Sequence, residues 1–198
     1  LTTMPFFLWP QQGALKGPGR YLFPILMNHT TREVVEIWDH VSSAIQQELL
    51  QKKGIHITGL GTFGVLRQEL LVGKNEHLPV DKPVFQLSQN VGKIDCLDYV
   101  RQSIADFMPV VPLEYSKLAL HMENMQEVVK NCIKLTLLCL SRCISKGLNI
   151  DFSFRNMGVL SIRGKKVKMR FYEKFAFSVD ATGNLEEVVT NVSCTLLT

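Results

Sequence analysis

The stretch GIHITGLGTFGVLRQELLV, residues 54–72, decides the fold of this chain. β-Branched and apolar residues lie on both sides of the segment Gly59-Leu-Gly61, which is typical of two strands joined by a tight turn. We expect these strands at residues 55–58 and 65–72. A polar hairpin at 73–77 should then lead into a third strand around residues 83–87, which completes a small sheet.

An amphipathic helix is predicted just before this sheet. Thr30 and Glu33 have the spacing of a capping box, which satisfies free amide groups at the start of a helix. Gly54 is expected to end the helix, because glycine readily adopts the left-handed conformation found there. Apolar residues at steps of three and four predict one buried face, made of Val34, Trp38, Val41, Ile45 and Leu49.

The second half of the chain repeats this order of elements. Asn124 and Glu127 should begin a second helix, and Gly147 should end it. Two strands are predicted at 150–154 and 158–162, and a turn at 163–166 leads into a third strand at 167–171. The buried face of this helix is predicted to consist of Val128, Cys132, Leu135, Cys139 and Cys143.

The two halves align when Gly61 is placed on Gly158. Apolar residues then fall on apolar residues at Leu60 on Met157, Ile57 on Phe154 and Phe63 on Leu160, and Phe85 falls on Phe177 when the second hairpin is taken as five residues shorter. Because the two halves align in this way across the unit, we infer an internal duplication.

The duplication divides the chain into three parts. Residues 1–24 are rich in proline and glycine and are expected to form an extended leader. The first repeat is assigned to residues 25–107 and includes a short helix at 90–99. The second repeat is assigned to residues 108–198. It begins with a proline-bracketed connector at 108–112, and residues 113–122 alternate enough to predict one more strand.

The composition indicates a globular protein of the cell interior. A hydrophobic fraction of 46% with 20% charged residues excludes a disordered chain. Five cysteines without a C-x-x-C pair are too sparse for a disulfide framework, so we expect a reducing compartment. No apolar run approaches the roughly 18 residues of a membrane span, so no membrane partner is expected.

The elements resemble the bacterial HU and integration-host-factor family, which carries a similar G-F-G-T-F turn and P-A-F segment. The matching segments are Gly59-Leu-Gly-Thr-Phe63 and Pro83-Val-Phe85, within an overlap of residues 30–99 and a fainter copy at 124–189. The resemblance implies an α+β fold of two HU-like units, each a helix against a three-stranded antiparallel sheet. HU subunits bury their helices in a dimer, so it also implies an intramolecular pseudo-dimer in which the Trp38 face meets the Cys139 face.

Within this superfamily the chain is similar to the eukaryotic coiled-coil domain-containing protein 81 family. The similarity rests on Gly61-Thr-Phe63, Pro83-Val-Phe85, Leu138-Cys-Leu-Ser-Arg142 with Ile144-Ser145, and above all Val167-Lys-Met-Arg-Phe-Tyr172. It implies a cytoplasmic protein of the cytoskeleton, at the centrosome or the cilium, whose tandem HU-like region precedes a long coiled coil.

The chain departs from the DNA-bending members of the superfamily in its hairpin arms. Those members insert a proline near the arm tip between base pairs. Here the first arm is expected to be clipped to residues 71–80, beside the acidic Glu76 and Asp81, and the second is only a Gly-Lys turn. DNA bending is therefore not expected.

Two candidate sites for cofactors are considered and set aside. Gly59, Gly61 and Gly64 fit the G-x-G-x-x-G dinucleotide fingerprint, but that motif must open a helix, whereas Phe63 and the residues after it favour a strand. Cys132, Cys139 and Cys143, with His121 as a fourth ligand, could be a zinc site; small buried thiols explain them better. We therefore expect no cofactor and no metal.

No catalytic residues are predicted either. The chain has no G-x-S-x-G elbow and no cysteine with a recognisable histidine partner. We therefore expect that the protein is not an enzyme.

A basic hairpin is the candidate interaction site. The chain is neutral over residues 1–111, carries +7 over 112–176 and −3 after that. Along the predicted strand 167–171, apolar residues alternate with cations, so one face should be core and the other charged. The row of cations, called here the basic row, consists of Arg163, Lys165, Lys166, Lys168 and Arg170.

Two interpretations of the basic row stay open. It can be a solvated outer face that keeps the strand from aggregating. It can also bind an acidic partner, either nucleic-acid phosphates or the acidic tails of a cytoskeletal protein such as tubulin. We favour a non-enzymatic scaffold module that binds acidic protein partners; the alternative is an HU-like protein that binds DNA without sequence preference.

Overall fold

The computed structural model of the chain describes residues 31–72, 76–88, 104–122, 125–164 and 166–195. The first half contains α1 (Thr31–Leu50), β1 (Gly54–Ile57), β2 (Gly61–Val72), β3 (Glu76–Leu87), the 3₁₀ helix η3 (Ile104–Asp106) and β4 (Val110–Pro112). The second half contains α3 (Tyr115–His121), α4 (Gln126–Ser145), β5 (Ile150–Phe154), β6 (Gly158–Arg163), β7 (Lys166–Phe171), α5 (Glu173–Val179) and α6 (Asn184–Thr195). The predicted α+β class is confirmed. The expected leader, Thr30 of the first capping box and the helix expected at 90–99 lie outside the described residues.

The strands form two sheets. The second sheet has the order β5-β6-β7 and is antiparallel throughout, as predicted. The first sheet has the order β3-β2-β1-β4, and β4 pairs with β1 in parallel, so it is four-stranded and mixed where three antiparallel strands were expected. The extra strand comes from the connector between the repeats, which therefore belongs to the first sheet.

Residues 113–122 were expected to form a strand, and this prediction is wrong. They contain α3, in which the neighbouring residues Leu118 and Ala119 are both buried. In a strand these two side chains would point to opposite faces, whereas on a helix they share a face with Tyr115 and Met122, which also pack on the core. The buried residues of this segment follow the spacing of a helix, and the alternation that predicted a strand does not match the observed burial.

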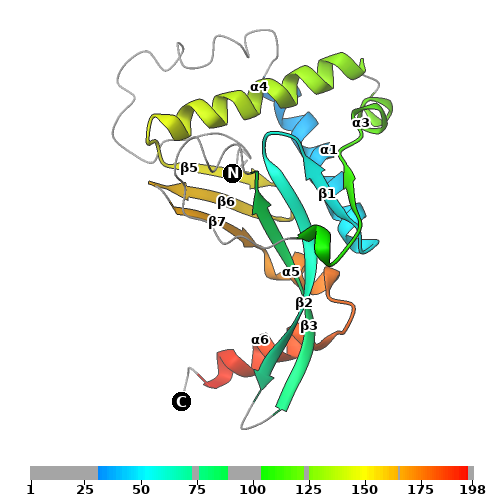
Figure 1. Cartoon of the computed structure of the whole chain (residues 1–198), viewed down its shortest axis with the longest axis vertical. Helices are drawn as coiled ribbons and strands as arrows, with labels where there is room; N and C mark the ends of the chain where they lie inside the picture. Colours follow the sequence, from blue (N-terminus) through cyan, green and yellow to red (C-terminus); the bar gives the residue numbers. More distant parts are fainter. Residues whose placement is uncertain (1–30, 73–75, 89–103, 123–124, 165, 196–198) are drawn as a thin grey trace.

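Figure 1 shows how the elements are arranged. Helix α4 lies along the top of the molecule above β5–β7, and the first sheet stands beside the second. The ribbon formed by β2 and β3 continues away from α4, and α6 lies beside its far part, in contact with β3.

The arm formed by β2 and β3 is longer than expected. Its ladder is continuous from the Gly61↔Leu87 pair to the Val72↔Glu76 pair, so the expected clipping to residues 71–80 is wrong. Pro79 and Pro83 argue against a strand in the sequence because they lack an amide donor. β3 is an edge strand, where a missing donor can face away from the sheet.

The C-terminus of α4 follows the prediction. Gly147 has φ +69°, and its amide donates to the carbonyl of Ile144 (2.8 Å). The amide of Leu148 donates to the carbonyl of Cys143 (3.1 Å). These two hydrogen bonds form a Schellman motif, with glycine at its left-handed position as expected.

The C-terminus of α1 has the same motif but a different residue in it. Lys53 donates its amide to Glu48 O (2.9 Å) and Lys52 to Leu49 O (3.0 Å), and Lys52 has φ +59°. The prediction that Gly54 ends α1 is therefore wrong, because Gly54 is the first residue of β1. A lysine holds the left-handed position, which costs about 1 kcal/mol relative to glycine.

The buried face of α1 is confirmed, and that of α4 is confirmed in part. Val34, Trp38, Val41, Ile45 and Leu49 are all buried. On α4 the three cysteines are buried, but Val128 and Leu135 are only half-buried. Helix α4 contacts both α1 and α3, so its buried face is wider than one stripe. That face also includes Val129, Ile133, Thr136, Leu137, Leu140 and Ile144.

The start of α4 also differs from the prediction. Asn124 lies outside the described residues, and the N-cap position belongs to Met125, which makes no side-chain capping hydrogen bond. The N-cap position therefore lies one residue after the expected one, and packing on the core stabilises the helix there.

The turns of the two repeats are equivalent. In each repeat, one hydrogen bond closes the turn and a second joins it to the residue after the third strand. In the first repeat these are Leu60 N to Ile57 O (3.0 Å) and Ser88 N to Leu60 O (2.9 Å). In the second repeat they are Met157 N to Phe154 O (3.1 Å) and Tyr172 N to Met157 O (2.9 Å). This correspondence matches the predicted placement of Gly61 on Gly158. The placement of Phe85 on Phe177 is wrong, because the second hairpin is shorter still: Phe85 pairs with Phe63 as Met169 pairs with Leu160, and Phe177 lies in α5.

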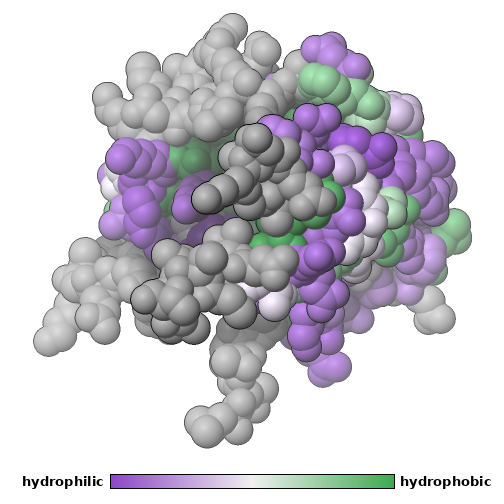
Figure 2. Space-filling model, turned by 90° about the horizontal axis from the view of Figure 1, so that it is seen from below, coloured by the Kyte–Doolittle hydropathy of each residue, from purple (hydrophilic) through white to green (hydrophobic). Residues whose placement is uncertain are grey.

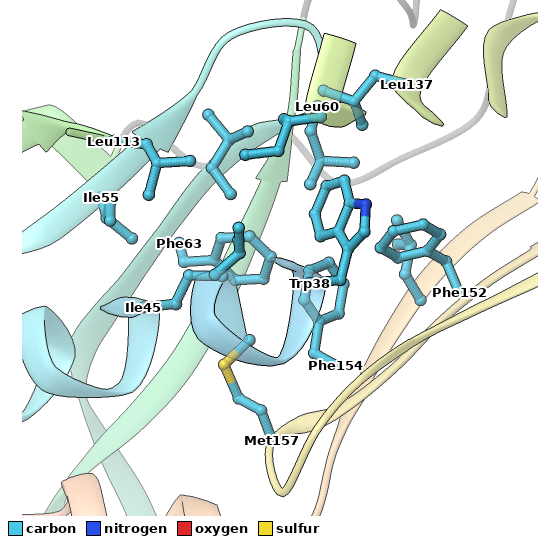
Figure 3. Packing of buried hydrophobic residues seen from close by; sticks show 14 of the residues in the cluster. Trp38, Ile45, Ile55, Leu60, Phe63, Leu113, Leu137, Phe152, Phe154 and Met157 are labelled. Atoms are coloured by element: carbon cyan, nitrogen blue, oxygen red, sulfur yellow. The ribbon is translucent and has the colours of Figure 1, made fainter. Parts of the chain in front are cut away.

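One hydrophobic core joins the two repeats (Figure 3). Trp38 of α1 meets Phe152 and Phe154 of β5 edge-on, with ring centroids 4.8 and 6.2 Å apart. Phe63 of β2 meets Phe154 in the same manner at 5.2 Å. The expected intramolecular packing of the repeats is therefore present: α1 contacts α4, and Trp38 also meets the aromatic rings of the second sheet.

The turn of each repeat lies against the long helix of the other repeat. At the second turn, the Arg155 amide donates to Ser42 Oγ (3.2 Å), and Gln46 of α1 donates to the Arg155 carbonyl (2.8 Å). At the first turn, a Cβ on Gly59 would contact the side chain of Leu137 on α4. This reciprocal arrangement is the one that a pseudo-dimer within one chain requires.

Hydrophilic side chains cover most of the described surface on the face seen in Figure 2, with smaller apolar areas between them. Among the described residues, no helix is long and apolar enough to span a membrane.

Candidate functional site

The outer face of the second sheet carries the described part of the basic row. Lys166, Lys168 and Arg170 of β7 are exposed, while Val167, Met169 and Phe171, which alternate with them, are half-buried against the core. The alternation along β7 is therefore as predicted. Lys165, at the turn, lies outside the described residues.

Arg163 differs from the other cations of the basic row. Its guanidinium binds the carboxylate of Asp151 on β5 (2.5 Å) and donates to the carbonyls of Ile150 (2.8 Å) and Ile162 (3.1 Å). Burial raises the pKa of Asp151, but hydrogen bonds from Arg163 and Ser161 outweigh this effect, so the pKa lies below its usual value. Arg163 is thus used to hold β5 beside β6, and its charge is neutralised.

Lys166, Lys168 and Arg170 are called here the exposed cations of β7. No carboxylate among the described residues forms an ion pair with any of them. They project from one face of one strand at steps of two residues, which places their side chains about 7 Å apart. A row of this kind presents three positive charges to a partner with negative charges at a matching spacing.

An open hollow lies at the C-terminal end of this row. It is lined by Asn156, Val159, Arg170, Phe171, Tyr172, Glu173 and Lys174. The side chain of Tyr172 is 48% exposed, so an aromatic surface is available next to the last cation.

The third strand of the first repeat uses its charge differently. Asp81 of β3 is only 4% exposed, yet its carboxylate binds Lys52 (3.0 Å) and Arg67 (2.9 Å). The hydrogen bond from Arg67 is the main cause that lowers the pKa of Asp81. Burial acts in the opposite direction, and the hydrogen bond from Lys52 lowers the pKa further. Asp81 is therefore not an acidic feature of the arm surface, as the sequence suggested, but a buried anion with two cationic partners.

Asp180 extends this network to the C-terminal helices. Its carboxylate accepts hydrogen bonds from the amides of Asp81 (3.0 Å), Thr182 (3.1 Å) and Leu185 (2.8 Å). Lys52 also donates to the Val179 carbonyl (2.5 Å). The end of α1, the base of the arm and the α5–α6 junction are thus joined at one point.

A small apolar cluster holds α6 against the arm. Val80 of β3 packs with Leu185 and Val188 of α6, and Leu70 and Leu78 lie at the edge of the cluster. One face of the arm is therefore covered. Neither the network nor this cluster was predicted, because both join the arm to the C-terminal helices; Asp81 and Asp180, for example, are 99 positions apart in the chain.

The glycine fingerprint has a structural explanation. Gly59 lies in the turn with φ +87°, and Gly61 and Gly64 lie in β2, so no helix follows the motif. A Cβ at Gly61 would lie 2.2 Å from the carbonyl oxygen of Gln86, and one at Gly158 would lie 2.2 Å from that of Arg170. These glycines are needed where the third strand of each repeat crosses close to the second.

The cysteines considered as zinc ligands lie within α4. Burial raises the pKa of Cys132 to about 11 and also raises the pKa of Cys139 and of Cys143. His121 is exposed on α3, where its ring contacts the carbonyl of Lys117 (2.7 Å). In the described part of the chain, no three histidine, cysteine or carboxylate groups are placed to hold a metal ion.

Two family descriptions match the chain one after the other. CCDC81 eukaryotic HU domain 1 matches residues 13–94, and CCDC81 eukaryotic HU domain 2 matches residues 109–183. Together with the two sheets and the reciprocal packing, these matches define a protein with two HU-like domains in tandem. The chain belongs to the CCDC81 family of eukaryotic HU domains. The resemblance seen in the sequence is thereby confirmed, and α6 lies outside both matched segments.

Proposed function

We propose that the tandem is a non-enzymatic scaffold module of a centrosomal or ciliary cytoskeletal protein, and that it binds an acidic protein segment through the exposed cations of β7. The observation that carries the proposal is the difference within the basic row. Arg163 is paired with Asp151 across the sheet, whereas Lys166, Lys168 and Arg170 project outward with no ion-pair partner among the described residues.

A solvated strand does not by itself require this arrangement. Several surface cations on other elements of the chain are paired: Lys117 binds Glu114 (3.1 Å), and Arg155 binds Asp39 (2.6 Å). The second repeat carries most of the positive charge of the chain, and three of its cations lie on one strand. The positive charge therefore forms a local patch. A local patch suits binding of one defined partner better than nonspecific attraction of any acidic molecule.

An acidic protein is favoured over nucleic acid because of the arms. Proteins of this superfamily that bend DNA insert an apolar wedge from the arm, and the first arm here is packed against α6 on one face. The second hairpin is too short to reach around a duplex, since β6 and β7 have only 6 residues each and are joined by a two-residue turn. An acidic cytoskeletal segment, of the chemistry found in tubulin tails, fits the row without any need for an arm.

The proposal is tested by charge reversal in the full-length tagged protein in ciliated cells. The variant Lys166→Glu, Lys168→Glu, Arg170→Glu should fold normally and lose its localisation, because exposed charges contribute little to stability. The matched control is Lys53→Glu, Lys134→Glu, Lys146→Glu, which makes the same change of charge at exposed lysines that form no ion pair among the described residues. If the triple variant of β7 localises like the parent, the proposal is wrong.

The alternative, DNA binding without sequence preference, makes a different prediction for the same variant. Three phosphate contacts should give a slope of about −3 in a plot of log K against log salt for duplex DNA. A measured slope near that value, lost in the β7 variant and kept in the control, would favour DNA over an acidic protein.

A further inference from the structure

Within the described part of the chain, the backbone of β7 is hydrogen-bonded to another strand along one edge, the edge beside β6. The amide of Tyr172 donates to Met157 O (2.9 Å). A Cβ at Gly158 would lie 2.2 Å from the Arg170 carbonyl oxygen. Tyr172 and Arg170 therefore direct their peptide groups toward β6 and the turn before it. Peptide groups alternate between the two edges of a strand. The amides and carbonyls of Val167 and Met169 therefore face the other edge, where no strand of the described chain pairs with them.

The side chains divide β7 in a second way. The exposed cations of β7 stand on the outer face of the sheet, while Val167 and Met169 lie half-buried on the inner face. A strand added at the free edge would thus meet three cations on one face and the rim of the hydrophobic core on the other.

The outer edges of the first sheet are blocked, in contrast to β7. β4 has only three residues and ends in Pro112. β3 contains Pro79 and Pro83 and is contacted by α5 and α6. Short strands, prolines and covering helices are the usual devices that protect a sheet edge. β7 has neither proline nor, among the described residues, a covering helix along its first residues.

The accessible part of this edge is the N-terminal part of β7. β3 approaches β7, and α5, which follows β7 directly, also contacts β3, so this approach is at the Phe171 end. Figure 1 shows the other end of β7, next to the β6–β7 turn, pointing away from the first sheet. Val167 and Met169 thus have the free peptide groups that a partner can reach.

We infer that the free edge of β7 binds its partner as an added β-strand in which acidic residues alternate with apolar ones. The inference rests on the proposed function and specifies its partner. In an added antiparallel strand, residues opposite Lys166, Lys168 and Arg170 would have Cβ atoms about 4.5–5.5 Å from them, close enough for three charge pairs. The intervening residues would cover Val167 and Met169. Main-chain hydrogen bonds would supply affinity and the side chains would supply selectivity.

The same cations exclude the most obvious competitor, which is a second copy of β7. Two copies paired edge to edge would place like charges directly opposite each other, which is destabilising. The exposed cations of β7 therefore have two roles: they oppose pairing with a second copy of the strand, and they favour pairing with an acidic strand.

The test uses the full chain and a short peptide that alternates glutamate and valine. Amide exchange measured by NMR should slow about tenfold or more at Val167 and Met169 when the peptide binds, while the Lys168 amide, which faces β6, should be protected with or without peptide. A scrambled peptide of the same composition and a peptide methylated on the paired backbone amides should each bind about tenfold more weakly. These two peptides keep the charge and lose only the strand pairing.

The outcomes separate this inference from the proposed function. If charge reversal at Lys166, Lys168 and Arg170 leaves peptide affinity unchanged, the proposed function is wrong and the inference fails with it. If reversal weakens binding but the scrambled and methylated peptides bind like the parent, with no protection at Val167 and Met169, the acidic partner stands and strand pairing is wrong. If duplex DNA displaces the peptide and binds more tightly at the same salt concentration, both are overturned.

Discussion

β3 and β7 occupy the same place in their repeats, each pairing with the strand that follows the glycine turn, yet their charges have opposite surroundings. On β3 the carboxylate of Asp81 is buried and bound by Lys52 and Arg67. On β7 the charged groups point outward and are not paired within the described chain. A duplicated unit has thus kept its scaffold while one copy became an internal anchor and the other an open surface.

The largest effect on stability is expected from a substitution in the core that the two repeats share. It tests whether the two repeats unfold together. Trp38→Ala should lower the free energy of unfolding by about 3–5 kcal/mol, because the indole fills the core between the repeats. Chemical denaturation should still show one transition for both halves. Leu138→Ala, at an exposed position of α4, is the control and should have little effect. Two separate transitions would mean that the repeats fold independently.

The next effect concerns the closed arm. Asp81→Asn should lower the free energy of unfolding by about 1.5–3 kcal/mol at neutral pH, because hydrogen bonds to a charged group are lost in a buried place. The folded pKa of Asp81 is lowered, so its contribution is fully present above the unfolded value of about 4 and is lost as the pH falls through the folded value. The difference between parent and variant should therefore shrink on acidification below about pH 4.

Asp106→Asn, at an exposed aspartate of η3, is the matched control for this experiment. Asp151 and Asp180 also have lowered pKa values and contribute to acid unfolding in both proteins. Only the difference between parent and Asp81→Asn isolates the arm. A difference that stays constant from neutral pH to pH 3 would contradict the ion-paired assignment.

A smaller change in the free energy of unfolding is expected at the C-terminal ends of the two long helices, α1 and α4. Lys52→Ala loses the bonds to Asp81 and Val179 but keeps a side chain at positive φ, whereas Lys52→Gly loses the same bonds and relieves the strain. The glycine variant should be the more stable of the two by about 1 kcal/mol. Gly147→Ala should cost about 1 kcal/mol, since it introduces the same strain into α4 without any compensating bond. Equal stability of the two Lys52 variants would refute this account.

The smallest effect is expected on the open strand. Lys168→Glu should change the free energy of unfolding by no more than about 0.5 kcal/mol, because the side chain is exposed and has no ion-pair partner among the described residues. Thermal unfolding of this variant beside Asp81→Asn measures the contrast between β7 and β3 directly. A large loss of stability would show that Lys168 serves the fold.

The sequence predicted those parts of the fold that are local. Gly61 and Gly158 indicated both turns correctly, because a close crossing of two strands admits no side chain there. The face of α1 was also correct, since a helix that buries one side keeps a regular spacing from Val34 to Leu49. These features depend on neighbours within about twenty residues.

The sequence failed where structure depends on distant partners. The parallel strand β4 forms only because β1, more than fifty residues earlier, offers a free edge. Lys52 at a helix end is unexpected until its contact with Val179 is seen. In the candidate site, the alternation of β7 was readable, but the neutralisation of Arg163 required the position of Asp151 on another strand. A one-dimensional pattern identifies which residues are charged and not which of them are already bound.

The shared core has a consequence for variants of the gene. Trp38 and Phe63 in the first repeat are covered by Phe154 in the second, so a product truncated in the connector would display these rings to solvent. Exposed apolar surface of this kind is what chaperones and proteases act on. Loss of the second repeat should therefore remove the first from the cell as well. We therefore expect the pair, and not the single HU-like unit, to be the smallest part of the chain that folds stably.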